Sequence, residues 1–162
     1  MYLFKYGGII QEKIIKYKFY EKAYLYNMFA EIIFKNLQVM KYIKSYEMII
    51  PIPLHKYRKR ERGYNQTYLI IKELSKRDNT IVMENDILKK QKNIKPQSSL
   101  NELQRNNNIK GAFYIENEIK IENKKVLLFD DVFTTGSTTN ECSKKLKEKG
   151  AKKVGILTIA KD

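Results

Sequence analysis

A short apolar run at residues 126–129, Val-Leu-Leu-Phe, is the feature that most restricts how this chain can fold. A strand with one solvent-exposed face alternates apolar and polar residues, whereas these four residues are all apolar. The run therefore predicts a central parallel strand that is covered on both faces. A helix over 138–149, ended by Gly150, and a second apolar strand over 154–160 are expected to follow it. Strand, helix and strand in this order predict an α/β fold with a parallel sheet.

Two shorter strands are expected earlier in the chain. Residues 2–6 alternate and are rich in aromatic side chains, and Gly7 follows them, which predicts an edge strand. Residues 48–52 predict a short buried strand that Pro51 and Pro53 stop.

Helices are expected where apolar residues recur at three- and four-residue intervals. One is predicted to begin near Ile9, and a second is predicted to run from Leu25 to Leu37. Asn65 is expected to cap a third helix, although it and Gln66 could equally serve a ligand. The stretch 55–63 between these elements is predicted to be a polar, cationic loop.

The length of 162 residues suits one domain with one core. We expect a helical hood over residues 1–45 and a core over 46–162, with a mobile loop at 89–108. The loop is polar and lacks a clean period, so a plain surface loop is the alternative.

The charge balance is strongly basic, with 32 Lys and Arg against 18 Asp and Glu, a formal net charge of +14. Such a surplus is typical of proteins with polyanionic partners, and a lysine-rich solvated surface is an equal alternative. The single cysteine, Cys142, excludes an intramolecular disulfide and a cysteine zinc site. No apolar run approaches the roughly 20 residues that span a bilayer, so we expect a cytoplasmic protein without membrane insertion.

The segment that follows the central strand carries the chemistry. Asp130 and Asp131 come at the carboxyl end of that strand, where open α/β sheets bind ligands, and could accept hydrogen bonds from ribose hydroxyls. The next residues are small, and their hydroxyl and N–H groups precede a helix start that favours an anion. A turn and a helix cap would explain one or two of these residues, but not the whole set. The residues predicted to hold a sugar 5′-phosphate are Thr134, Thr135, Gly136, Ser137 and Thr138.

Residues 126–138 resemble the motif of type I phosphoribosyltransferases that binds 5-phosphoribosyl-1-pyrophosphate (PRPP). The wider chain resembles the ComF family of competence proteins, in four stretches besides that motif. The stretches that carry this resemblance are Tyr6-Gly7-Gly8, Ile15-Lys16-Tyr17-Lys18, Ile50-Pro51-Ile52-Pro53-Leu54 with the basic run to Gln66, and Gln97 to Phe113. The chain differs from many members in having no four-cysteine zinc finger at its start, so zinc is not expected.

The resemblance implies a type I phosphoribosyltransferase fold, a parallel sheet flanked by helices with a small hood. It implies PRPP as ligand and Mg²⁺ as cofactor, with the metal held mainly by PRPP rather than by direct protein ligands. It makes Asp130 and Asp131 the catalytic residues and places the pyrophosphate at Leu54, His55 and Lys56. Contacts to phosphate or DNA are expected from Arg58, Arg60, Arg62 and Arg105, although a solvated basic loop is the simpler alternative.

Two functions remain open at this point. The resemblance implies a role in natural transformation, through handling of single-stranded DNA together with proteins of the competence machinery. The alternative is an active phosphoribosyltransferase that transfers phosphoribose from PRPP to a nucleobase or another small acceptor.

Overall fold

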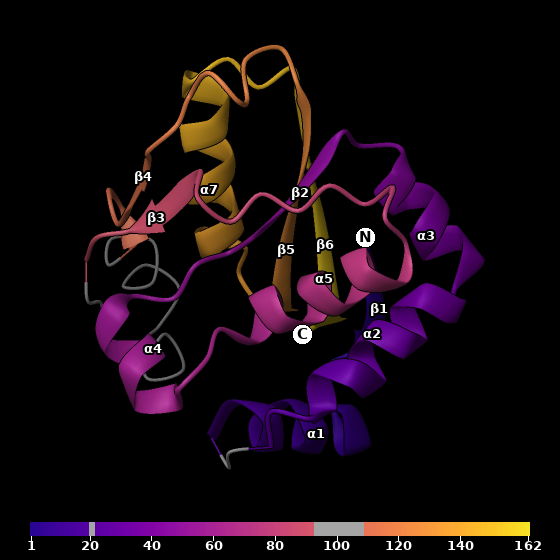
Figure 1. The fold of residues 1–162 in the computed structure, drawn as a ribbon. Coiled ribbons are helices and arrows are strands. Elements are labelled where there is room, and N and C mark those ends of the chain that lie inside the picture. Colours follow the sequence, from indigo (N-terminus) through magenta and orange to yellow (C-terminus); the bar gives the residue numbers. More distant parts are fainter. Residues whose placement is uncertain (20–21, 93–108) are drawn as a thin grey trace.

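The computed structural model describes residues 1–19, 22–92 and 109–162, and its centre is one parallel sheet (Figure 1). Its strand order is β1-β6-β5-β2, and every neighbouring pair is parallel. The predicted central strand is confirmed, since it pairs with a strand on each side and runs beyond the expected end. Pro51 lies inside its strand, so only Pro53 follows it as a stop. The strands are β1 (Tyr2–Lys5), β2 (Met48–Pro51), β5 (Lys125–Phe133) and β6 (Lys153–Lys161).

Helices cover both faces of this sheet, as the apolar run predicts. Leu127 and Phe129 of β5 pack with the helices of one face, whereas Val126 and Leu128 pack with those of the other. The first face carries α1 (Gly8–Phe19), α2 (Leu25–Lys35), α3 (Leu37–Lys44) and α5 (Gln66–Arg77). The second carries α7 (Ser137–Glu148) and an antiparallel hairpin of β3 (Leu88–Lys90) and β4 (Phe113–Ile115).

The prediction of one helix from Leu25 to Leu37 is wrong, because two helices meet at Asn36. The backbone of Asn36 is extended, with φ −89° and ψ 100°, and its side-chain oxygen accepts a hydrogen bond from Val39 N at 3.1 Å. Asn36 therefore ends α2 and caps α3. Leu37 is 83% exposed and does not belong to the apolar face of α2.

The prediction of a loop over 55–63 is also wrong, because this stretch forms the helix α4 (Lys56–Arg62). His55 caps it, with Nδ1 accepting from Tyr57 N at 3.4 Å, and Gly63 ends it with a φ of 80°. None of the residues of α4 is buried, so the sequence lacks the apolar periodicity that would predict this helix. Lysine and arginine favour helices, and the two caps satisfy the ends of this short one.

The N-terminal part joins the main sheet directly. Strand β1 pairs only with β6, at the sheet edge, as predicted. The division into a hood and a core stays a prediction, and most of the loop predicted at 89–108 lies outside the described residues. No helix in the described ranges is both long and apolar enough to cross a membrane.

Candidate functional site

The predicted phosphate loop joins the end of β5 to the start of α7. Gly136 has a φ of 77°, and a Cβ atom there would lie 2.7 Å from Cζ of Phe133. Only glycine fits this position without strain, for both reasons. The hydroxyls of Thr135 and Ser137 lie 2.7 Å apart, and Ser137 N donates to Thr135 Oγ1 at 3.4 Å. The tight turn thus sets small hydroxyl side chains at the first turn of a twelve-residue helix.

Asp131 is buried on the face that α1 and α5 cover. It is 5% exposed, and both of its carboxylate oxygens have partners within the chain. Lys18 Nζ donates to Oδ1 at 2.7 Å, and Gln66 Nε2 donates to Oδ2 at 2.5 Å. Asp131, one of the two residues predicted to accept ribose hydroxyls, is therefore hydrogen-bonded within the chain.

The contacts of Asp131 extend into a network that ties α1 to α4 and α5. The guanidinium of Arg62 donates to Gln66 Oε1, and the hydroxyl of Tyr17 donates to the main-chain oxygen of Gln66 at 2.8 Å. Tyr64 donates to the main-chain oxygen of Tyr17, and their rings stack at 5.6 Å. Burial lowers the pKa of the Arg62 guanidinium, the direction expected for a charge taken out of water.

Asp130 belongs to the opposite face of β5 and is half-buried. Its Oδ1 accepts a hydrogen bond from the main-chain N–H of Asp131 at 2.9 Å. Burial, followed by the negative charge of Asp131, raises the pKa of Asp130 to about 7, while Lys18 and Lys90 oppose this rise. Lys90 lies at the end of β3 with Nζ 5.3 Å from the ring centre of Phe113, and burial lowers its pKa. A carboxyl that changes charge near neutral pH thus sits beside a desolvated ammonium.

The predicted pyrophosphate segment follows β2, next to the end of β5, because Ile52 N donates to Phe129 O at 2.9 Å. Within residues 1–19, 22–92 and 109–162, no acceptor bonds the main-chain N–H groups of Leu54, His55 or Lys56. Unpaired N–H groups of this kind can bind an anion.

The imidazole of His55 has a structural role. It is 5% exposed, Nδ1 accepts from Tyr57 N, and Nε2 lies 3.1 Å from the carbonyl oxygen of Gln91. A carbonyl oxygen only accepts, so Nε2 is the donor to Gln91 and Nδ1 is the acceptor from Tyr57. Both nitrogens are thus occupied, which leaves no free position for acid–base chemistry.

Of the four residues predicted to contact phosphate or DNA, the three that the structure describes are not brought together. Arg58 is paired with Glu61 at 2.8 Å, and Arg62 points into the buried network. Arg60 lies two residues from each, on a different side of α4, and Arg105 lies outside the described residues. The exposed cations that share a helix face are instead Lys56, Lys59 and Arg60, beside the half-exposed ring of Tyr57.

Sequence reasoning gave no site role to Lys18 or Lys90, and for Gln66 it left a ligand role open beside helix capping. Lys18 and Gln66 lie in stretches that carry the ComF resemblance, which is the one signal that could have singled them out. Lys90 has no such signal, since its importance comes from the hairpin that places it near Asp130. In the described part of the chain, no three His, Cys, Asp or Glu side chains gather as a metal site.

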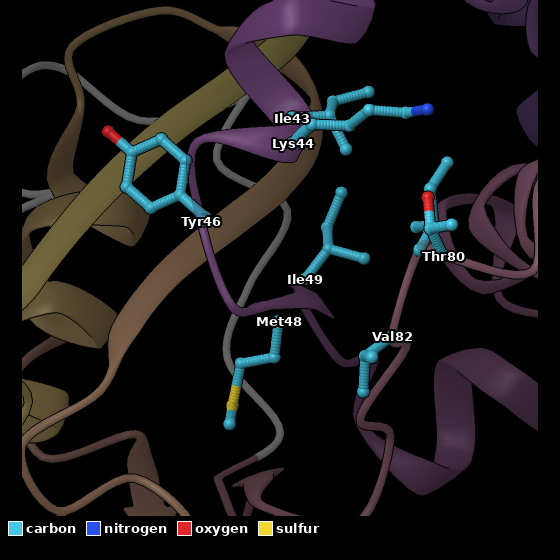
Figure 2. Close-up of a pocket in the computed structure, with 8 residues that line it drawn as sticks. Ile43, Lys44, Tyr46, Met48, Ile49, Thr80 and Val82 are labelled. Atoms are coloured by element: carbon cyan, nitrogen blue, oxygen red, sulfur yellow. The ribbon is translucent and has the colours of Figure 1, made fainter.

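A cavity of about 340 Å³ lies at the other end of the sheet, where β2 begins (Figure 2). Figure 2 shows that its walls come from the end of α3, from β2 and from the segment after α5. None of the predicted ligand residues lines it. The lining residues are Ile43, Lys44, Tyr46, Met48, Ile49, Thr80, Ile81 and Val82.

Comparison of the sequence with known proteins shows the family of this chain. Residues 62–162 match the model of the phosphoribosyl transferase domain. Competence protein F of Haemophilus influenzae is 34% identical over 91% of this chain, and competence protein ComFC of Streptococcus pneumoniae is 31% identical over 98%. The chain spans 66% of the length of each relative. A hypoxanthine phosphoribosyltransferase structure from Staphylococcus aureus, at 16% identity, has a TM-score of 0.47 over 85% of this chain and 63% of its own. The family match rests on the sequence, and the chain belongs to the phosphoribosyl transferase domain family, with the type I fold, and to its ComF branch.

Proposed function

We propose that this chain binds PRPP together with Mg²⁺ at the carboxyl end of β5. The turn at Gly136 carries the proposal, because it sets the hydroxyls of Thr135 and Ser137 at the first turn of α7. The positive end of a helix dipole and small hydroxyl side chains are a favourable site for a phosphate. In this arrangement residues 134–138 hold the 5′-phosphate.

The other parts of PRPP find partners next to this loop. Asp130 is the carboxyl with fewer internal partners, and its second oxygen can accept a hydrogen bond from a ribose hydroxyl. The main-chain N–H groups of Leu54, His55 and Lys56, which have no acceptor among the described residues, follow the neighbouring strand and suit the pyrophosphate. The residues proposed for the 5′-phosphate and those proposed for the pyrophosphate of the same ligand thus follow two adjacent strands, β5 and β2.

The residues present fit a magnesium ion that the ligand itself holds. Mg²⁺ is usually bound through one or two carboxylates, water and phosphate oxygens rather than by a cage of protein groups. Asp130 supplies one carboxylate at this place. When bound, the metal would supply positive charge to the pyrophosphate oxygens.

If the chain turns over, its own residues act by positioning and by charge. Lys18, Lys90 and Arg62 surround the two aspartates and can offset the negative charge that grows on a departing pyrophosphate. Release of pyrophosphate from PRPP in the presence of nucleobases would favour the enzyme over a protein that only binds the ligand.

Calorimetric titration of the protein with PRPP and Mg²⁺ tests the proposal. The wild type should bind, and Asp130→Asn should weaken binding by ~1–3 kcal/mol, the size of a hydrogen bond to a charged group. Asp86→Asn, at an exposed aspartate of the β3 region, is the matched control and should bind like the wild type. Absence of heat and of any thermal shift at millimolar PRPP would refute the proposal.

We also propose that the chain handles single-stranded DNA during DNA uptake. The relatives that resemble it are named competence proteins and DNA utilization proteins. Three cations, Lys56, Lys59 and Arg60, lie on the exposed side of α4 next to Tyr57, a pattern that suits a phosphate backbone with a base stacked on the ring. Fluorescence anisotropy with a labelled oligonucleotide tests this binding, and an unchanged signal at low salt would refute it.

A further inference from the structure

The ion pair between Lys18 and Asp131 lies at the position where the ribose of PRPP is expected to bind. Lys18 Nζ lies 2.7 Å from Asp131 Oδ1, and the two side chains are 21% and 7% exposed. The last turn of α1 brings the lysine to the end of β5, across 113 residues of sequence. Gln66 donates to the other oxygen. Each carboxylate oxygen could accept a second hydrogen bond, but the Asp131 side chain is only 7% exposed, so a ribose hydroxyl reaches it only if Lys18 or Gln66 moves away.

Displacing the lysine separates two charges that are largely out of water. An ammonium that loses its partner in such a place is costly unless another anion receives it. Among the described residues, the charged groups nearby are a poor substitute, because Arg62 is a cation and Asp130 lies on the opposite face of β5. The pyrophosphate segment 54–56 follows β2, which pairs with β5, so a ligand bound there places its negative charge at the same end of the sheet as the Lys18–Asp131 pair.

Ligands with and without a pyrophosphate should therefore differ at this point. PRPP brings ribose hydroxyls for Asp131 and phosphate oxygens for the released ammonium. Ribose 5-phosphate brings the same hydroxyls but leaves the ammonium without a partner. We propose that Lys18 is a specificity-determining residue, which occupies Asp131 in the free protein and yields it only to a ribose ligand that carries a pyrophosphate.

This inference rests on the proposed binding of PRPP, and calorimetry with two ligands tests it. Dissociation constants for PRPP and for ribose 5-phosphate are measured in Mg²⁺ for the wild type and for Lys18→Met. The variant should bind PRPP more weakly and ribose 5-phosphate at least as well. The preference for PRPP, as the ratio of the two constants, should fall at least about tenfold, the size of one charge-assisted hydrogen bond.

Two control variants separate this role from a structural one. Lys35→Met removes the same charge from an exposed ion pair with Glu31 on α2, and should keep the wild-type ratio. Lys18→Arg keeps the charge and should restore most of the preference. Lys18→Gln can still donate a hydrogen bond to Asp131 and is the second neutral variant, should Lys18→Met not fold.

The outcomes are distinguishable. A wild type that does not bind PRPP refutes the proposed function, and this is seen before any variant is made. A wild type that binds PRPP, with neutral variants that keep the same ratio, overturns the role of Lys18 alone. If neither neutral variant folds, Lys18 is a structural residue and the inference fails.

Discussion

Asp130 and Asp131 are adjacent in β5, yet their carboxyl groups belong to opposite faces of the sheet. Asp131 shares its side with Phe129 and is held by Lys18 and Gln66, whereas Asp130 is the neighbour of Lys90. Successive side chains of a strand alternate between faces, so two consecutive acids are presented to two different surroundings. The two carboxyls therefore differ in their partners: Asp131 is held by Lys18 and Gln66, whereas burial and the charge of Asp131 raise the pKa of Asp130 to about 7.

The pH dependence of stability should report on Asp130. An unfolded aspartate titrates near its ordinary pKa of 3.8, whereas the pKa of Asp130 in the folded chain is raised to about 7. Between these values the folded chain keeps a proton that the unfolded chain has lost, so the free energy of unfolding falls as pH rises and levels off above about 7. Asp130→Asn removes this dependence.

Urea denaturation at pH 5 and pH 8 measures the effect. The wild type should lose roughly 2 kcal/mol more than Asp130→Asn across this range. Parallel losses in the two proteins would show that Asp130 is not the group that titrates.

The basic face of α4 should set the salt dependence of DNA binding. Each phosphate contact to a single strand contributes about −0.7 to the slope of log affinity against log salt. Replacing Lys56, Lys59 and Arg60 together with Ala should therefore make the slope shallower by roughly two units. Anisotropy titrations at several salt concentrations give the slope.

A matched control for that variant lies at the C-terminal end of α7 and in the residue that follows it. Lys144, Lys145 and Lys149 pair with glutamates on the surface, and their replacement with Ala changes the net charge by the same amount. This control should leave the slope near the wild-type value. Equal slopes in both triple variants would remove α4 from the DNA site.

Gly136→Ala should disturb the phosphate loop through both backbone and packing. The residue has a φ of 77°, and the new Cβ would meet the ring of Phe133 at 2.7 Å. Gly63 also has a positive φ, 80°, but there is open space around it. Gly63→Ala therefore measures the effect of backbone strain alone on the free energy of unfolding. Gly136→Ala should lower the free energy of unfolding by at least ~1 kcal/mol more than Gly63→Ala.

The same pair of variants separates stability from binding. Gly136→Ala should also lower PRPP affinity more than tenfold by calorimetry, because the hydroxyls of the loop move with the turn. Wild-type PRPP affinity in a folded Gly136→Ala protein would place the 5′-phosphate elsewhere.

Gly155→Ala should destabilise the sheet far from the ligand loop. Tyr46 packs its ring and hydroxyl against Gly155 of β6, in the space that a Cβ would take. The variant should lose roughly 1–3 kcal/mol of unfolding free energy. In a Tyr46→Ala background the added methyl group has room, so most of this loss should disappear, and a double-mutant cycle measures that coupling.

The strand β5, the turn at Gly136 and the start of α7 could be predicted from sequence because the information for them is local. A buried strand, two acids, a turn glycine and a helix start lie within about twenty consecutive positions, and each constrains the next. The central strand, the edge strand and the capped helix at Asn65 were predicted for similar reasons.

The helix α4, its arginines and the partner of Asp131 could not be predicted, because they depend on three-dimensional contacts that the order of residues does not show. Arg58, Arg60 and Arg62 look like one cluster along the chain, but a helix turns by about 100° per residue and separates the middle one. The ion pair of Lys18 with Asp131 joins residues 113 positions apart, and no periodicity links them. The helix α4 was missed because it buries no apolar side chain.

The pairing of the first strand with the last has a consequence for biosynthesis. Strand β1 pairs only with β6, and the amino group of Met1 donates to Ile156 O at 2.8 Å. A ribosome that adds ~5–20 residues per second exposes residues 2–5 on the order of ten seconds before their partner emerges. Native strand pairing at this edge therefore waits for the synthesis of β6, and until then the aromatic strand β1 is an unpaired edge that other chains could pair with.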